Sequence, residues 1–328
     1  MYIGLAKQLQ RVINPKNHTE KKLKLQFNMD GLPLFKSGGV ELLPILGKVN
    51  FHSDLYEPFI IAAYKGIGKP SILHRYLDKF IQELNYLLSN EVIIEDELFT
   101  IEIMCFICDT PARALVKNIV GHQGFYDCET YTQKGLRIDN RTIFPSIDAP
   151  KRSDESFRKQ EQPDNHNGFS PLLNIKPFID MIFHFSLDFM HLCCLGVMKK
   201  LLEFWLTSIV DSRLSRMYIM QLTQRLTNLS NQIPTEFQRQ ILQSLGLISK
   251  WKATEFRFFL LYCCPLVLKN LLPEEKYNHF MYFYVSMRIL CSNEFRQKFA
   301  TQAENYLKRF VLLCAKLYKV AIVSYKCA

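Results

Sequence analysis

The chain has 328 residues, of which 48% are hydrophobic, and a formal net charge of +10. This length and composition allow a sizeable buried core in one large or two ordinary domains. The longest apolar run, 256–268, contains Arg257 and Pro265 and is too short to span a bilayer, and the N-terminal residues lack the apolar core of a signal peptide.

The distribution of basic residues and cysteines indicates the compartment and the kind of partner. Basic residues are spread along the chain, which favours nucleic acid before an anionic membrane; a basic enzyme with an acidic substrate is the alternative. The ten cysteines lie mostly in apolar runs, as small core residues do in a reducing compartment. We therefore expect a cytosolic or nuclear protein without a disulfide framework.

The first 120 residues alternate between strand and helix patterns. After a short helix and a polar hinge, the expected elements are strands at 22–30, 40–43 and 58–66, a helix at 73–88 capped by Ser71, a hairpin element at 91–97, a strand at 101–108 and a helix at 111–120. This order is that of the mixed α/β ribonuclease-H-like fold.

Two of these strands end at an aspartate. Apolar and polar residues alternate up to Asp30, which is typical of a half-buried strand. The run that ends at Asp109 is almost wholly apolar, as in a strand covered on both faces, and Pro111 then opens a helix. Carboxylates at the tips of neighbouring strands repel each other unless a divalent cation lies between them. Asp30 and Asp109 are therefore candidate metal ligands.

The later part of the chain changes in composition. Polar residues, glycine and proline dominate 121–170, which predicts loops, and from 172 onward the chain is apolar and predicted to be helical. We expect four segments, namely an N-terminal helix and hinge (1–20), the first part of the core (21–120), an insertion of loops and then helices (121–245), and a helical part of the core with a third acid (246–328).

Glu255 is the candidate for that third acid. It would share a helix face with several aromatic residues, where a carboxylate is costly unless it is paired or metal-bound. An ion pair with Lys252 or Arg257, or plain exposure, would explain it without a metal. Glu203 is a competing candidate in similar surroundings.

Several strings, in a fixed order from about residue 20 to 325, point to one family. They are Met29-Asp30-Gly31-Leu32-Pro33, Cys108-Asp109-Thr110-Pro111-Ala112-Arg113-Ala114, Gly121-His122-Gln123-Gly124-Phe125, His166-Asn167-Gly168-Phe169-Ser170, Leu187-Asp188-Phe189-Met190-His191-Leu192 and Lys252-Ala253-Thr254-Glu255-Phe256-Arg257. This series resembles the transposase core of animal-type CACTA (En/Spm-type) DNA transposons.

The resemblance implies a ribonuclease-H-like DDE core, interrupted by an insertion, in which Asp30, Asp109 and Glu255 are the catalytic acids. They would hold two Mg²⁺ (or Mn²⁺) ions for DNA cleavage and strand transfer. The resemblance further implies a nuclear protein that binds transposon ends and target DNA, with a homo-oligomer as a further expectation. No membrane and no small-molecule substrate is expected.

The chain departs from that family in its insertion. The family carries Cys-x-x-Cys there, but Tyr131 stands where the cysteine after Cys128 would be. Asp188 and His191, spaced i, i+3, could share a helix face and complete a degenerate structural site with Cys128. Because tyrosine is a poor zinc ligand, an intact zinc site is not expected.

Two other functions remain open from the sequence. Both ends look short relative to the family, which together with Tyr131 favours a catalytically inactive, domesticated or decayed remnant that binds only DNA or protein. Alternatively, the chain is a scaffold in which Asp30 and Asp109 are ordinary strand-end residues.

Overall fold

The computed structural model describes residues 1–35, 39–51, 55–121, 124–126, 128–138, 141–144, 146, 148–207, 213–230, 232–233 and 245–318. The chain forms two compact units, each with its own apolar core. The first comprises Met1–Lys134 and Pro150–Asp188, and the second comprises Gly135–Ala149 and Phe189–Ala328. The first unit thus takes most of the loops of the predicted insertion, and the second takes its helices together with the predicted C-terminal segment.

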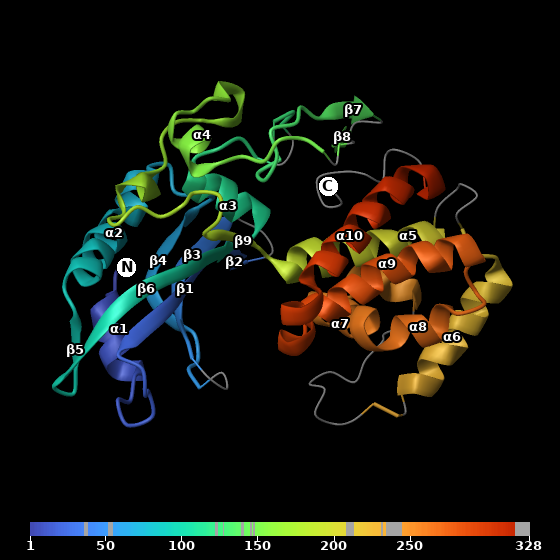
Figure 1. Cartoon of the computed structure of the whole chain (residues 1–328), viewed down its shortest axis with the longest axis horizontal. Helices are drawn as coiled ribbons and strands as arrows, with labels where there is room; N and C mark the ends of the chain where they lie inside the picture. Colours follow the sequence, from blue (N-terminus) through green and yellow to red (C-terminus); the bar gives the residue numbers. More distant parts are fainter. Residues whose placement is uncertain are drawn as a thin grey trace. The chain divides into compact units, whose positions relative to one another are not determined.

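The first unit is a mixed sheet with helices (Figure 1). Its elements are α1 Leu5–Val12, β1 Lys22–Met29, β2 Leu32–Pro33, β3 Val40–Asn50, β4 Phe59–Ile67, α2 Leu73–Ser89, β5 Val92–Ile94, β6 Glu97–Cys108, α3 Thr110–Lys117, α4 Asp154–Arg158, the 3-10 turns Pro163–Asn165 and Pro171–Asn174, and β9 Phe185–Leu187. The prediction of a mixed α/β protein is confirmed.

Strand β1 lies in the middle of this sheet. It pairs antiparallel with β3 and parallel with β6, and β3 in turn pairs with β2 and β4. β6 pairs antiparallel with β5 near its start and parallel with β9 along its last three residues. The two parallel pairs therefore bring the carboxyl ends of β1, β6 and β9 to one edge of the sheet.

The alternation in the sequence of β1 explains how the sheet buries one face. Leu23, Leu25, Phe27 and Met29 have no exposed surface, while the residues between them are half-buried. The ring of Phe27 meets that of Phe80 on α2 edge to face, with 5.1 Å between centroids, so α2 packs on this face. The prediction of a half-buried strand is confirmed.

Three expectations for the first unit are wrong. Strand β6 buries Phe99, Ile103, Phe106 and Cys108. Thr100 and Glu102 between them are exposed, so the strand is not covered on both faces. Ile72, without a side-chain cap, precedes helix α2 instead of a capping Ser71. Finally, β9 is a strand in a stretch predicted to be helical, and it pairs in parallel with β6 along three residues.

The second unit is almost wholly helical. Its elements are the hairpin β7 Leu136–Ile138 and β8 Arg141–Ile143, a π-helical segment Met190–Met198 (η4), α5 Lys199–Thr207, α6 Arg216–Ser230, a 3-10 segment Leu245–Lys250, α7 Ala253–Phe258, a π-helical segment Phe259–Cys263, α8 Cys264–Leu268, α9 Glu274–Leu290 and α10 Asn293–Tyr318.

Trp205 lies at the centre of this second core. It is fully buried, its ring meets Phe280 edge to face at 5.7 Å, and its Nε1–H donates to Tyr318 Oη at 3.2 Å. Helices α9 and α10, which carry these two partners, pack side by side (Figure 1). Among the helices in the described ranges, none is both long and apolar enough to cross a bilayer.

Candidate functional site

Asp30 and Asp109 directly follow the ends of two neighbouring parallel strands, β1 and β6. Met29 of β1 and Cys108 of β6 are register partners in the parallel ladder, and each aspartate directly follows one of them. Neighbouring strands lie about 4.8 Å apart. The structure therefore brings the two aspartates together at the carboxyl edge of the first unit, as the sequence predicts.

Asp109 has a structural role of its own at this edge. It is the N-cap of α3, and its Oδ1 accepts a hydrogen bond from Ala112 N at 2.7 Å. Such a cap stabilises the start of a helix by about 1 kcal/mol. The hydrogen bond also fixes the carboxylate in one orientation, and it engages one of the two carboxylate oxygens.

A third aspartate lies at the same edge and was not predicted there. Leu187 of β9 is the register partner of Cys108, so Asp188 follows β9 as Asp109 follows β6. The signal that could have revealed it is the alternation of apolar and polar residues through Phe183-His184-Phe185-Ser186-Leu187-Asp188, which is typical of a strand. Asp188 is the last residue of the first unit.

Glu255 lies in the second unit, in the first turn of α7. It is 7% exposed, and its Oε2 accepts a hydrogen bond from the main-chain nitrogen of Lys252 at 2.7 Å. Plain exposure of Glu255 is therefore wrong. The competing acid, Glu203 on α5, is a surface residue with 45% of its side chain exposed, and it lies 3.9 Å from Lys199 Nζ.

The donor chemistry of these acids suits Mg²⁺ or Mn²⁺, which prefer carboxylate oxygen. Within the described ranges, however, no group of three or more His, Cys, Asp and Glu side chains is arranged to hold a metal ion. The first unit has three aspartates at one edge of its sheet, Asp30, Asp109 and Asp188, and Glu255 lies in the second unit.

The degenerate structural site expected at Cys128, Asp188 and His191 remains a prediction. Cys128 is buried, its Sγ accepts a hydrogen bond from Tyr131 N at 3.3 Å, and burial raises the pKa of its thiol. Asp188 ends the first unit, whereas the exposed His191 belongs to the second. His122, from the same motif region, lies outside the described residues.

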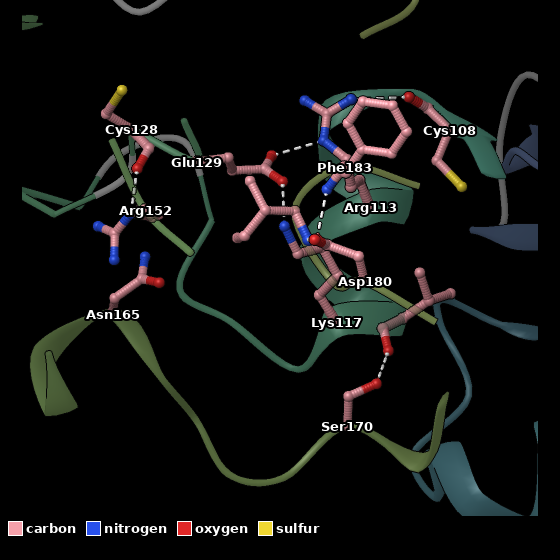
Figure 2. Close-up of polar contacts among 12 residues, drawn as sticks. Cys108, Arg113, Lys117, Cys128, Glu129, Arg152, Asn165, Ser170, Asp180 and Phe183 are labelled. Atoms are coloured by element: carbon pink, nitrogen blue, oxygen red, sulfur yellow. Dashed lines mark hydrogen bonds and ion pairs between the residues drawn. The ribbon is translucent and has the colours of Figure 1, made fainter. Parts of the chain in front are cut away.

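Directly behind Asp109 lies a buried ionic cluster that the sequence did not reveal. Arg113 Nε donates to Glu129 Oε1 at 2.6 Å and Lys117 Nζ donates to Glu129 Oε2 at 3.1 Å, with 6% or less of each side chain exposed (Figure 2). Arg113 also donates from Nη1 to Cys108 O at 3.0 Å, the carbonyl that precedes Asp109. The cluster thus joins the end of β6, two turns of α3 and the loop at 129.

The charges in this cluster determine one another's protonation. Burial alone would raise the pKa of Glu129, but the cations Lys117 and Arg113 outweigh burial and hold that pKa below its ordinary value. Burial also lowers the pKa of Lys117, against the opposing effect of Glu129. The Lys117 ammonium is further surrounded by the rings of Phe157 and Phe185, 5.3 and 5.2 Å from its Nζ.

Hydrogen bonds from later parts of the first unit fix the loop that carries Glu129. Arg152 donates from Nε to Cys128 O at 2.8 Å and from Nη2 to Tyr126 O at 3.1 Å, and Asn165 Nδ2 donates to the same Tyr126 carbonyl at 2.6 Å. Ser170 Oγ donates to Val116 O on α3 at 2.6 Å (Figure 2). The described loops of the insertion therefore pack against α3 through specific hydrogen bonds and ion pairs.

No protein-family model matches this chain, and no curated protein matches its sequence. The function therefore has to be argued from the residues and the geometry above.

Proposed function

We propose that the chain is a DDE-type transposase core that cleaves DNA and joins DNA strands in the nucleus, with its first unit as the ribonuclease-H-like part. The observation that carries the proposal is the register of β1 and β6, which sets Asp30 and Asp109 beside each other at one edge. The net charge of +10 suits a polyanionic substrate. The ordered strings that resemble those of CACTA transposases suggest the reaction class.

In this proposal Asp30 and Asp109, at the edge of the first unit, would hold Mg²⁺ or Mn²⁺, and Glu255 is the third acid that the resemblance implies. The metal ions would supply activation of a water or 3′-hydroxyl and stabilisation of the departing 3′-oxygen. The chain's own contribution is rigidity. Asp109 is fixed by its bond to Ala112 N, and Glu255 is fixed by its bond to Lys252 N. No covalent bond to the protein is needed, since a hydroxyl oxygen replaces the leaving oxygen on phosphorus directly.

Nicking of supercoiled plasmid DNA by the full chain, in Mg²⁺ or Mn²⁺, tests the proposal. Asp30→Asn and Asp109→Asn should each reduce the nicking rate at least 100-fold, because an amide is a much weaker ligand for these cations. The matched control is Asp78→Asn, an exposed aspartate of α2 whose contact is a hydrogen bond from Gln82, and it should nick at the wild-type rate. Nicking by Asp109→Asn equal to wild type would refute the proposed chemistry.

The second candidate is a remnant that binds DNA without cleaving it. The observation that favours it is the pair Cys128 and Tyr131, because the one cysteine left of the family's pair is buried and hydrogen-bonded rather than available to a metal. Absence of nicking in either metal, together with DNA binding that weakens steeply as salt rises, would support it. A log–log salt slope near zero would exclude phosphate contacts and with them both candidates.

A further inference from the structure

The end of strand β6 is held from two sides. Asp109 caps α3 through Ala112 N, and one turn later Arg113 donates from Nη1 to Cys108 O, immediately before Asp109. Arg113 is 3% exposed, so its guanidinium competes with little water for these contacts. Whatever fixes the Arg113 side chain therefore also fixes the main chain from which the Asp109 carboxylate projects.

Glu129 is what fixes it. Its Oε1 accepts from Arg113 Nε at 2.6 Å, and its Oε2 accepts from Lys117 Nζ at 3.1 Å. The two carboxylate oxygens thus face two different cations of the same helix, and the bond to Arg113 sets the guanidinium plane that reaches Cys108 O. Figure 2 shows the chain of contacts from Glu129 through Arg113 to Cys108.

The position of Glu129 is itself determined by the insertion. Arg152 and Asn165 hold the carbonyls of Tyr126 and Cys128, just before it in the chain. A buried ion pair of this kind gives no more stability than well-packed apolar residues would. Its value here is directional, because Glu129 Oε1 fixes the Arg113 guanidinium on the helix that begins with Asp109.

We propose that Glu129 is a positioning residue for Asp109, acting through Arg113 and the Cys108 carbonyl so that the insertion sets the geometry of the metal-binding edge. This inference rests on the proposed function, since it assigns Asp109 a metal to hold. Partners that orient metal ligands typically change metal affinity 10- to 100-fold when they are removed.

The experiment measures Mn²⁺ binding to the full chain by electron paramagnetic resonance, without DNA, beside thermal unfolding of each variant. Glu129→Gln should weaken the Mn²⁺ affinity 10- to 100-fold. Arg113→Lys keeps the positive charge but loses the guanidinium, which binds both Glu129 and Cys108 O. It should weaken the Mn²⁺ affinity by a similar factor, and it tests the proposal even if Glu129→Gln fails to fold. Excess Mn²⁺ should restore plasmid nicking in both.

Lys117→Met is the matched control inside the cluster. Lys117 is as buried as Arg113 and also binds Glu129, but the hydrogen bond to Cys108 O comes from Arg113. The variant should lower the unfolding temperature yet leave the Mn²⁺ affinity within about twofold of wild type. Glu155→Gln, at an exposed pair with Lys159, should change neither quantity.

The outcomes separate the two proposals. Tight Mn²⁺ binding that Asp109→Asn abolishes but Glu129→Gln leaves unchanged would overturn the positioning role and leave the proposed function standing. Equal losses of affinity in Glu129→Gln and Lys117→Met, in step with lost stability, would show a merely structural cluster. Absence of Mn²⁺ binding in the wild-type chain would overturn both.

Discussion

Leu187 of β9 and Cys108 of β6 are partners in a parallel ladder, so Asp188 leaves the sheet beside Asp109. We therefore predict that Asp188→Asn weakens Mn²⁺ binding about tenfold, less than Asp109→Asn does. Unit charges about 8 Å apart interact by about 2 kcal/mol at an effective dielectric constant near 20, and less where water enters. The exposed Asp164 supplies the control, Asp164→Asn. An unchanged Mn²⁺ affinity in Asp188→Asn would show that the charge of Asp188 does not contribute to metal binding.

Glu83 of α2 joins the N-terminal helix to the rest of the first unit. Its Oε2 accepts from Leu5 N at 2.6 Å, its Oε1 accepts from Ala6 N at 3.1 Å, and Tyr2 donates its hydroxyl to the same carboxylate. A carboxylate at a helix N-terminus satisfies amide groups that have no partner in the helix and meets the positive end of the helix dipole.

Glu83→Gln should therefore lower the free energy of unfolding by about 1.5–3 kcal/mol, the range for hydrogen bonds to charged groups. Urea unfolding monitored by circular dichroism measures this loss. Glu91→Gln, at an exposed position just after the same helix, should stay within about 0.5 kcal/mol of wild type. Equal midpoints for the two variants would mean that α1 is not held through Glu83.

In the second unit the buried indole of Trp205 depends on a single phenol. Tyr318→Phe removes the acceptor of the Trp205 Nε1–H bond while keeping the ring, so the indole donor is left buried and unpaired. The expected loss of stability is about 1–3 kcal/mol. Tyr86→Phe, on a tyrosine with 64% of its surface exposed, should cost much less. Comparable urea midpoints for Tyr318→Phe and wild type would contradict this hydrogen bond.

The elements that the sequence predicted well are those whose side-chain period is set locally. The alternation in β1 and the apolar stripe of α2 are both visible in one stretch of chain, and both were placed within a few residues of their observed bounds. The adjacency of Asp30 and Asp109 also followed, because strands that share a sheet and a direction end at the same edge.

What the sequence did not reveal depends on contacts between distant segments. Strand β9 is three residues long, and it exists through its pairing with β6, about 80 positions earlier in the chain. The ion pair between Arg113 and Glu129 forms because the loop that carries Glu129 packs against α3, and no sequence periodicity predicts that packing. Glu255 was correctly singled out as a costly buried acid, but its bond to Lys252 N is a main-chain contact that residue types alone do not specify.

We predict that the buried His279 makes the stability of the second unit depend on pH. It is 1% exposed, Nε2–H donates to Phe310 O at 2.9 Å, and among the described residues Nδ1 has no hydrogen-bond partner. Burial lowers the pKa of this imidazole. Protonation would place a charged N–H at Nδ1, where none of the described residues accepts a hydrogen bond, so the neutral form is the one that fits the fold.

The sign follows from linkage. Below the ordinary histidine pKa of about 6.5 the unfolded chain binds a proton that the folded chain resists, so stability is fully present above that pH and falls as the pH drops toward the lowered folded-state pKa. Each pH unit through that window costs about 1.4 kcal/mol.

The urea midpoint of the wild-type chain should therefore fall between pH 7 and pH 5. His279→Phe keeps the ring that stacks on Phe310. This variant should be less stable at pH 7, and its urea midpoint should depend less on pH. His18 and His166, whose pKa values burial also lowers, remain in that variant and leave a residual slope. A slope unchanged by His279→Phe would assign the whole pH dependence to those two histidines of the first unit.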